Sequence, residues 1–152
     1  MVMEYAEHKS LQSYLELEEQ LKKYERCKEC NQINTDFSLW CQICNSKRFQ
    51  QNFKNWTSGN DGIDRFIKNI QLLANNWYKL LEWILYDRFY DVEYIAKDGF
   101  GTLYKAKWKD GYIRNWNIND FQWNRYGLEF VILKSLNNSQ NVTLEFINEV
   151  IN

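Results

Sequence analysis

Four cysteines are the residues of this 152-residue chain whose spacing points most directly to chemistry. CKEC at 27–30 and CQIC at 41–44 give the pattern C-x2-C-x10-C-x2-C, built from Cys27, Cys30, Cys41 and Cys44, and no other cysteine remains. Each C-x-x-C bends the backbone so that two thiolates face one ion. Two such pairs complete a tetrahedral site that suits Zn²⁺ or, less often, iron. The spacing therefore predicts a structural zinc site.

Two other states of these cysteines stay open. Four reduced thiols without a metal form one alternative, and disulfides form the other, which is the least expected in a reducing compartment. A closed four-thiolate site has no free coordination position, so we expect no catalysis at the metal. Zinc binding would supply roughly 10–16 kcal/mol of apparent folding free energy to so short a segment.

The cysteine spacing also resembles the zinc finger of the Ran-binding-protein type. Three residues separate Cys30 from Asn34, and six separate Asn34 from Cys41, as that family requires. The family's tryptophan two residues before the first cysteine is Glu25 here, and its Thr-Phe pair is Asn31-Gln32. The resemblance implies a metal-binding fold and does not extend to the family's recognition of ubiquitin or RNA.

Basic and aromatic residues follow the cysteines, namely Lys47, Arg48, Phe49, Lys54 and Trp56. A protein that binds single strands stacks bases on such rings and places cations beside phosphates. The alternative is a surface helix with one buried aromatic residue, and we prefer it. The net charge of −1 provides no long-range attraction for nucleic acid, so nucleic acid is not expected as a partner.

A second group of residues lies in the last third of the chain. It comprises IAKDGFGTLYKA at 95–106, VILK at 131–134 and, fifteen residues after Lys134, Glu149 in FINEV. The aromatic and β-branched runs FYDVEYIA and TLYKAKWK, joined by KDGFG, predict a β-hairpin. GLEFVILKSL predicts a third, more buried strand that carries Lys134.

In this order the features resemble the N-lobe of a protein kinase, with its glycine-rich hairpin, its third-strand lysine and the glutamate of its first helix. The chain is most similar to the tyrosine-kinase-like family that is expanded in some fungi. There a CxxC…CxxC element, a WTSGN segment (56–60) and an EWI…YDRFY segment (82–90) precede the hairpin. The resemblance covers about residues 24–152 and implies ATP-dependent protein phosphorylation, a transferase activity.

The resemblance also implies the parts of an ATP site. The hairpin would fold over the triphosphate of Mg-ATP with its backbone amides facing the anion. Lys134 would contact the α- and β-phosphates, and Glu149 would hold the lysine in place. The implied ATP-binding residues are Ala96, Lys97, Asp98, Gly99, Phe100, Gly101, Leu103 and Lys134, with Glu149 as the lysine's partner.

Several positions depart from the family pattern G-x-G-x-x-G-x-V. Ala96 and Asp98 stand at the first two glycines, and Leu103 stands at the valine. Ile132 stands where the family has an alanine against adenine. A carboxylate at position 98 repels phosphates, and the extra methylenes of Ile132 crowd a fitted site. We therefore expect a weakened affinity for ATP.

The chain contains no H-R-D-L-x-x-x-N, D-F-G or A-P-E motif. In kinases these motifs supply the catalytic base and the magnesium ligands. We therefore expect an N-terminal fragment of a protein kinase that is not catalytically competent alone, with no catalytic residue of its own. The alternative is a non-catalytic, zinc-containing binding or scaffold module, or the remnant of a pseudokinase.

Several further elements must position these groups. Residues 4–25 predict an amphipathic helix, whose apolar face could contact a protein partner. Asn60 or Asp61 is expected to cap a helix from residue 63 to 85 that breaks at Asn75-Asn76. Residues 112–127, which carry Trp116 and Trp123, are irregular and separate the second and third strands, and a long hairpin loop that packs on itself is preferred there over a contact with a partner or nucleic acid. A last helix is expected to start in VTLEFINEVIN.

The fold class expected is α+β, with an incomplete antiparallel kinase N-lobe sheet, N-terminal helices and a small four-cysteine element. The expected domain ranges are 1–25 for the amphipathic helix, 26–56 for the zinc-ribbon-like element, 57–86 for a helical linker and 87–152 for the truncated N-lobe. No secretory signal or long apolar run is visible. A cytoplasmic or nuclear location without membrane contact is expected.

Overall fold

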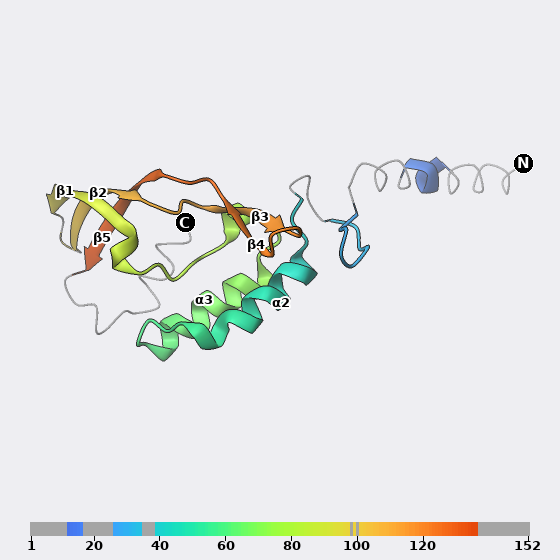
Figure 1. Cartoon of the computed structure of the whole chain (residues 1–152), viewed down its shortest axis with the longest axis horizontal. Helices are drawn as coiled ribbons and strands as arrows, with labels where there is room; N and C mark the ends of the chain where they lie inside the picture. Colours follow the sequence, from blue (N-terminus) through green and yellow to red (C-terminus); the bar gives the residue numbers. More distant parts are fainter. Residues whose placement is uncertain (1–11, 17–25, 35–38, 98, 100, 137–152) are drawn as a thin grey trace, which may run out of the picture. The chain divides into compact units, whose positions relative to one another are not determined.

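The computed structural model describes residues 12–16, 26–34, 39–97, 99 and 101–136. It is a mixed α+β structure with antiparallel sheets (Figure 1). The chain divides into two compact units, one of Met1–Trp83 with Ile113–Asn124 and one of Ile84–Tyr112 with Arg125–Asn152. The domain ranges from the sequence stay a prediction, and they did not anticipate that Ile113–Asn124 groups with the first unit.

Two helices form the framework of the first unit. Helix α2 (Gln42–Asn52) continues into the 3-10 turn η1 (Phe53–Asn55), and α3 (Asp61–Leu73) lies beside α2 (Figure 1). Asn60 is the N-cap of α3, because its side chain accepts hydrogen bonds from Gly62 N and Ile63 N at 2.9 and 3.2 Å. The predicted cap of this helix is confirmed.

The WTSGN segment (56–60) leads into α3 and contains its N-cap residue. The carboxylate of Asp64, in the first turn of the helix, accepts hydrogen bonds from Ser58 Oγ at 2.5 Å, Thr57 Oγ1 at 2.6 Å and Ser58 N at 2.8 Å. These hydrogen bonds, first those of Ser58, lower the pKa of Asp64 to about 2, because they favour the charged form. The segment therefore has a structural role, since it folds back onto the helix that follows it.

The predicted second helix after Asn75-Asn76 is wrong. The chain leaves the helical conformation at Ala74, and residues 75–85 contain a single 3-10 turn, η2 (Trp77–Lys79), which Asn76 caps by accepting from Lys79 N at 3.1 Å. Trp77 and Leu80 then pack against the core of the first unit. Tertiary packing, rather than the helical spacing of the apolar residues, sets the path of this segment.

The long hairpin loop expected at 112–127 is more regular than predicted. It contains a β-hairpin of β3 (Ile113–Asn117) and β4 (Gln122–Arg125). Asn117 closes its turn, because Oδ1 accepts from Asn119 N and Asp120 N, and Asn124 Nδ2 donates to Asn115 Oδ1 across the strands at 3.0 Å.

An aromatic stack forms the core of the first unit. Trp40 is fully buried, and its ring lies 6.3 Å from Phe49 of α2 and 5.9 Å from Trp123 of β4. Phe49 and Trp123 are 4.9 Å apart and nearly parallel. The indole N–H of Trp40 donates to Ala74 O at 2.9 Å, so the largest buried side chain has its polar atom satisfied. The stack joins the loop before α2, the helix itself and the hairpin.

Trp40→Ala should therefore lower the free energy of unfolding by about 3–5 kcal/mol, because it leaves a cavity at the centre of the stack. Urea denaturation followed by circular dichroism measures the change. Leu73→Ala is the control, since Leu73 is 71% exposed and should cost less than about 0.5 kcal/mol. Equal losses in the two variants would contradict the central role of the stack.

The second unit contains a three-stranded antiparallel sheet in the order β1-β2-β5 (Figure 1). Its strands are β1 (Phe89–Lys97), β2 (Gly101–Trp108) and β5 (Glu129–Leu136). The predicted hairpin and the existence of the third strand are confirmed, but the expectation that this strand is the more buried one is wrong, because residues 129–135 are all partly or fully exposed and the buried residues lie on β2. Ala106 and Trp108 of β2 are buried on one face, while Phe130 and Ile132 on β5 are 60% and 61% exposed.

The chain just beyond the end of β2 is held by an ion pair and by a close backbone contact. Arg88 forms a bidentate ion pair with Asp110, which lowers the pKa of the aspartate. Gly111 follows with a φ of +65°, and a side chain there would overlap the carbonyl of Gly127. Position 111 therefore needs glycine for two reasons, its backbone conformation and the close approach of a second backbone.

Gly111→Ala should destabilise the second unit more than Gly127→Ala. Both glycines have a positive φ, but a Cβ at Gly127 meets open space. We expect about 1 kcal/mol of backbone strain in each variant and an additional loss only at position 111. Thermal unfolding of the two variants makes the comparison. Equal unfolding temperatures of the two variants would contradict this expectation, since they would mean that the backbone of Gly127 moves aside without a loss of stability.

Candidate metal centre

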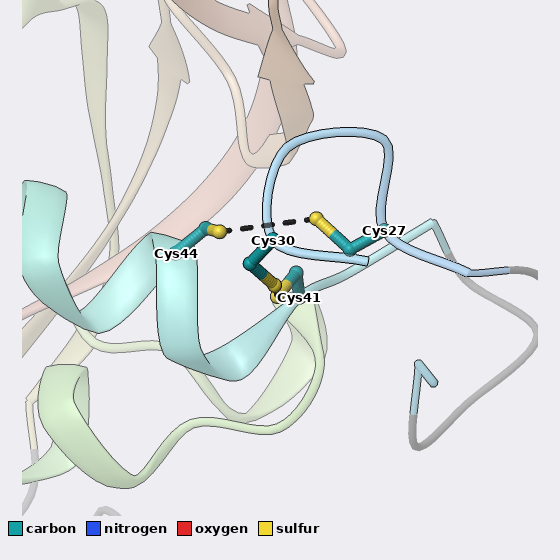
Figure 2. A group of neighbouring side chains, drawn as sticks. All are labelled: Cys27, Cys30, Cys41 and Cys44. Carbon is teal, nitrogen blue, oxygen red and sulfur yellow. Dashed lines mark hydrogen bonds between the residues drawn. The ribbon is translucent and has the colours of Figure 1, made fainter. Parts of the chain in front are cut away.

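The four cysteine sulfurs converge in the first unit. Their Sγ atoms all lie within 4.8 Å of one another, and none forms a disulfide (Figure 2). Cys27 and Cys30 come from the loop at 26–34, and Cys41 and Cys44 come from the N-terminal end of α2. The structure thus brings together the four residues that the sequence selected.

Backbone hydrogen bonds shape the loop that carries the first pair. Cys27 N donates to Gln32 O at 2.8 Å, and Asn31 N donates to Cys27 O at 2.9 Å. Asn31 adopts a left-handed conformation with a φ of 58°, which asparagine tolerates better than most residues. Its position directly after the second cysteine therefore has a local conformational reason.

Helix α2 holds the second pair in a fixed relation. Cys41 is the N-cap residue of the helix, and Cys44 lies in its first turn. The positive end of a helix dipole favours thiolates. Trp40, the centre of the aromatic stack, directly precedes Cys41, so the core also fixes the direction from which this pair approaches.

The sulfur spacing fits a tetrahedral metal site. Metal–sulfur bonds of about 2.3 Å in a tetrahedron place the sulfurs about 3.8 Å apart. Cys27 Sγ lies 3.8 Å from Cys44 Sγ, and Cys30 Sγ lies 3.5 Å from Cys41 Sγ. The four cysteines could therefore hold a metal ion such as zinc.

The four thiols differ in how easily they ionise. A hydrogen bond with the backbone of Gln32 lowers the pKa of Cys30 to about 7. Burial raises the pKa of Cys41 and also that of Cys44. Thiolates crowded at this distance repel one another, so a cation is the natural means of stabilising all four.

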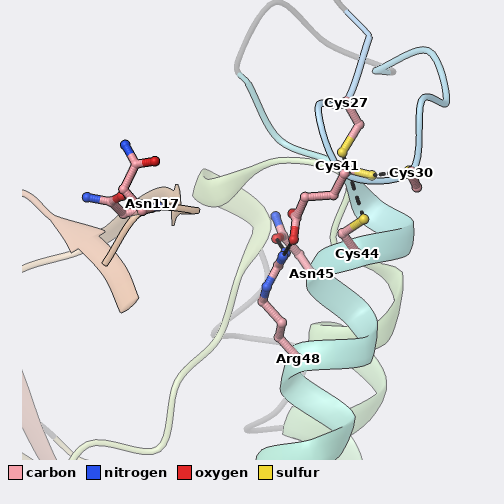
Figure 3. A network of polar contacts seen from close by, with 9 residues as sticks. Cys27, Cys30, Cys41, Cys44, Asn45, Arg48 and Asn117 are labelled. Atoms are coloured by element: carbon pink, nitrogen blue, oxygen red, sulfur yellow. Dashed lines mark hydrogen bonds and ion pairs between the residues drawn. The ribbon is translucent and has the colours of Figure 1, made fainter. Parts of the chain in front are cut away.

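An arginine links the cysteine loop to its surroundings. Arg48 of α2 forms an ion pair with Glu29, which lies between Cys27 and Cys30 in the sequence, and it donates to Asn45 Oδ1 at 2.8 Å (Figure 3). The guanidinium of Arg48 also lies 4.4 Å from the ring centre of Trp116 on β3. One side chain therefore contacts the loop, the helix and the hairpin.

A polar pocket of about 480 Å³ lies beside the sulfurs. Its walls include six asparagines, three basic residues and one acid: Asn34, Asn45, Asn115, Asn117, Asn119, Asn124, Arg26, Lys28, Arg48 and Glu29. The charged side chains sum to +2 (three positive, one negative). A divalent ion with four thiolates carries −2, so these cations would offset the charge of an occupied centre.

The kinase-like residues lie elsewhere, in the second unit. Leu103 of β2 pairs with Ala96 of β1 on one side and with Lys134 of β5 on the other. Lys97 pairs with Thr102, and Gly101 begins β2. Asp98, Phe100 and Glu149, together with residues 1–11, 17–25 and 137–152, fall outside the described residues, so the proposed roles there stay predictions.

The basic and aromatic residues after the cysteines do not form one stacking surface. Phe49 is buried in the aromatic stack, and Arg48 covers Trp116. Trp56 lies 5.1 Å from Lys68 Nζ. The preferred interpretation, a helix with one buried aromatic residue, is confirmed for 42–52.

The sequence singled out Trp116 and Trp123 but did not place them on strands or predict their partners in this unit. A signal for the strands was present in part, because alternating residues in IRNWN and QWNR flank the turn-forming stretch IND. Their partners Arg48 and Phe49 lie more than 60 residues earlier in the chain. Local sequence patterns carry no information about contacts between residues so far apart in the chain.

Comparison with protein-family models, curated proteins and solved structures finds no match for this chain. Among the residues that the structure describes, no helix is long and apolar enough to cross a lipid bilayer.

Zinc affinity at this centre should fall steeply as the pH is lowered. The raised pKa of Cys41 and of Cys44 keeps both thiols protonated at neutral pH without metal, so binding must displace at least these two protons. Displacing two protons gives a loss of about a hundredfold for each pH unit lowered. Chelator competition between pH 8 and pH 6, corrected for the protonation of the chelator, measures the slope. An affinity that does not change with pH would contradict a thiolate centre.

Proposed function

We propose that this chain is the N-terminal part of a protein kinase, in which a structural zinc centre precedes a sheet that binds ATP. The zinc half of the proposal is supported by the convergence of four sulfurs at tetrahedral spacing. Zinc suits four thiolates and requires no other ligand. Cys27, Cys30, Cys41 and Cys44 would hold the ion, which would stabilise the loop at 26–34 against α2.

The ATP half is supported by one observation, the row Ala96–Leu103–Lys134 across three strands. Residues that pair directly in an antiparallel sheet point to the same face. Leu103 pairs with Lys134, and Ile132 pairs with Lys105 two residues further along, so both pairs share that face. A hairpin residue, an apolar residue and a cation thus face one side, as a nucleotide site of this type needs.

The same face is open in the second unit. Ile132 is 61% exposed and Phe130, two residues away on the same strand, is 60% exposed. An adenine ring needs an apolar surface, and a phosphate needs a cation at one end of it. Ile132 and Lys134 supply these two properties two residues apart. By this proposal the chain provides half of the site, and phosphoryl transfer would require groups that the sequence lacks.

Titration with a fluorescent ATP analogue tests the site. We expect binding in the micromolar to millimolar range, and Lys134→Ala should weaken it by about tenfold or more, because the phosphates lose their cation. Lys109→Ala is the matched control, since this exposed lysine lies just beyond the opposite end of β2. Absence of binding up to millimolar ATP, or equal losses in the two variants, would reject the nucleotide site.

Elemental analysis of the purified protein tests the metal independently. About one equivalent of zinc is expected, and Cys44→Ser should reduce it well below that value, because a hydroxyl is a poor fourth ligand. Less than about half an equivalent in the unaltered chain would reject the four-thiolate site.

A non-catalytic binding module is the second candidate. The polar pocket beside the sulfurs favours it, because six asparagines around one cavity offer many donors and acceptors to a partner. Zinc content with no ATP binding would favour this candidate over the first.

A further inference from the structure

The Arg48 side chain contacts several separate elements of the first unit. It joins three elements that are distant in the sequence: the cysteine loop through Glu29, helix α2 through Asn45 and the β3–β4 hairpin through Trp116. Figure 3 shows Arg48 and Asn45 on α2 near the four cysteines. Its side chain is only 16% exposed, so these contacts are partly shielded from water. Cation–π and ionic contacts are stronger in such surroundings than on an open surface.

The loop contact depends on the cysteines. Glu29 lies between Cys27 and Cys30, and hydrogen bonds from Cys27 N and Asn31 N hold this turn. A metal that holds Cys27 and Cys30 would fix the position of the Glu29 carboxylate between them. Arg48 would then have a fixed anion on one side, and its guanidinium would be held over the indole on the other side.

The contact of Arg48 with Trp116 links Arg48 to the aromatic stack. Trp116 meets Trp123 edge to face at 5.0 Å, and Trp123 belongs to the aromatic stack. The hairpin is also an insertion between β2 and β5 in the sequence, and Tyr126 N donates to Tyr112 O at 2.9 Å where the chain returns. The order of the hairpin therefore depends on contacts at both of its ends.

We propose that Arg48 is a metal-responsive clasp, which couples occupancy of the four-cysteine centre to the order of the β3–β4 hairpin through Glu29 and Trp116. The inference rests on the proposed metal and does not use the proposed nucleotide site. Coupling of this kind is reciprocal, so the hairpin must also influence the affinity for the metal. Arg48, Glu29 and Trp116 are positioning residues, since none of them supplies a metal ligand.

Hydrogen exchange of the full chain, loaded with zinc, tests the first direction. Arg48→Met keeps the length of the side chain and removes its charge. Peptides covering 113–124 should exchange about tenfold faster in this variant, while one equivalent of zinc remains bound. Arg65→Met is the matched control, because Arg65 is an exposed arginine on α3 of the same unit and should leave the hairpin unchanged.

Zinc affinity tests the reverse direction. Trp116→Leu removes the ring under the guanidinium, and Trp116→Phe keeps a ring face at the same place. Chelator competition at pH 7.5 should show zinc binding about tenfold weaker in the leucine variant and nearly unchanged in the phenylalanine variant. A residue that only fills space would give similar affinities in both variants.

The outcomes are separable. An unaltered chain that binds no zinc overturns the metal proposal together with the clasp. A zinc-loaded chain in which Arg48→Met leaves hairpin exchange unchanged overturns the clasp alone. If Arg48→Met does not fold, the Trp116 pair decides, and equal zinc affinities of its two variants overturn the clasp.

Discussion

The stack of Trp40, Phe49 and Trp123 is the interaction on which the first unit depends. Trp40 directly precedes Cys41, Phe49 lies one turn beyond Cys44 on α2, and Trp123 belongs to the hairpin. Large rings gain stability by removing apolar area from water and by packing closely. By fixing the start of α2, the stack also fixes where the second cysteine pair points, so the four-cysteine cluster depends on a hydrophobic contact.

The residues around the four cysteines would offset the negative charge of the thiolates. Thiolates a few ångströms apart repel one another, and burial raises the pKa of Cys41 and of Cys44, so forming thiolates there carries a cost in the absence of a cation. A divalent ion would remove most of it, and the basic residues of the adjacent pocket would offset the remainder. The ion pair of Arg48 with Glu29 orients one of these cations, and it does so within reach of the hairpin.

The second unit differs from the first in that much of its apolar surface is exposed. Its three strands have one face with buried Ala106 and Trp108, while Phe130 and Ile132 on β5 remain open to solvent. This face is mixed, because Lys105 and Lys107 of β2 lie over the ring of Phe130 at 4.9 and 5.8 Å. The kinase-like interpretation of this sheet stays a proposal, and it rests on the order of sequence motifs whose individual matches were weak.

The sequence by itself determined the features that local chemistry specifies. Cysteine spacing selected the four ligands, alternating strands with KDGFG selected the hairpin, and Asn60 marked the start of α3. Only the tertiary structure decided the path after Ala74, the β3–β4 hairpin and its grouping with the first unit. These features arise from contacts between residues far apart in the chain, such as Phe49 with Trp123. Local propensity and periodicity carry no information about such contacts, because their free energy exists only once the chain has folded.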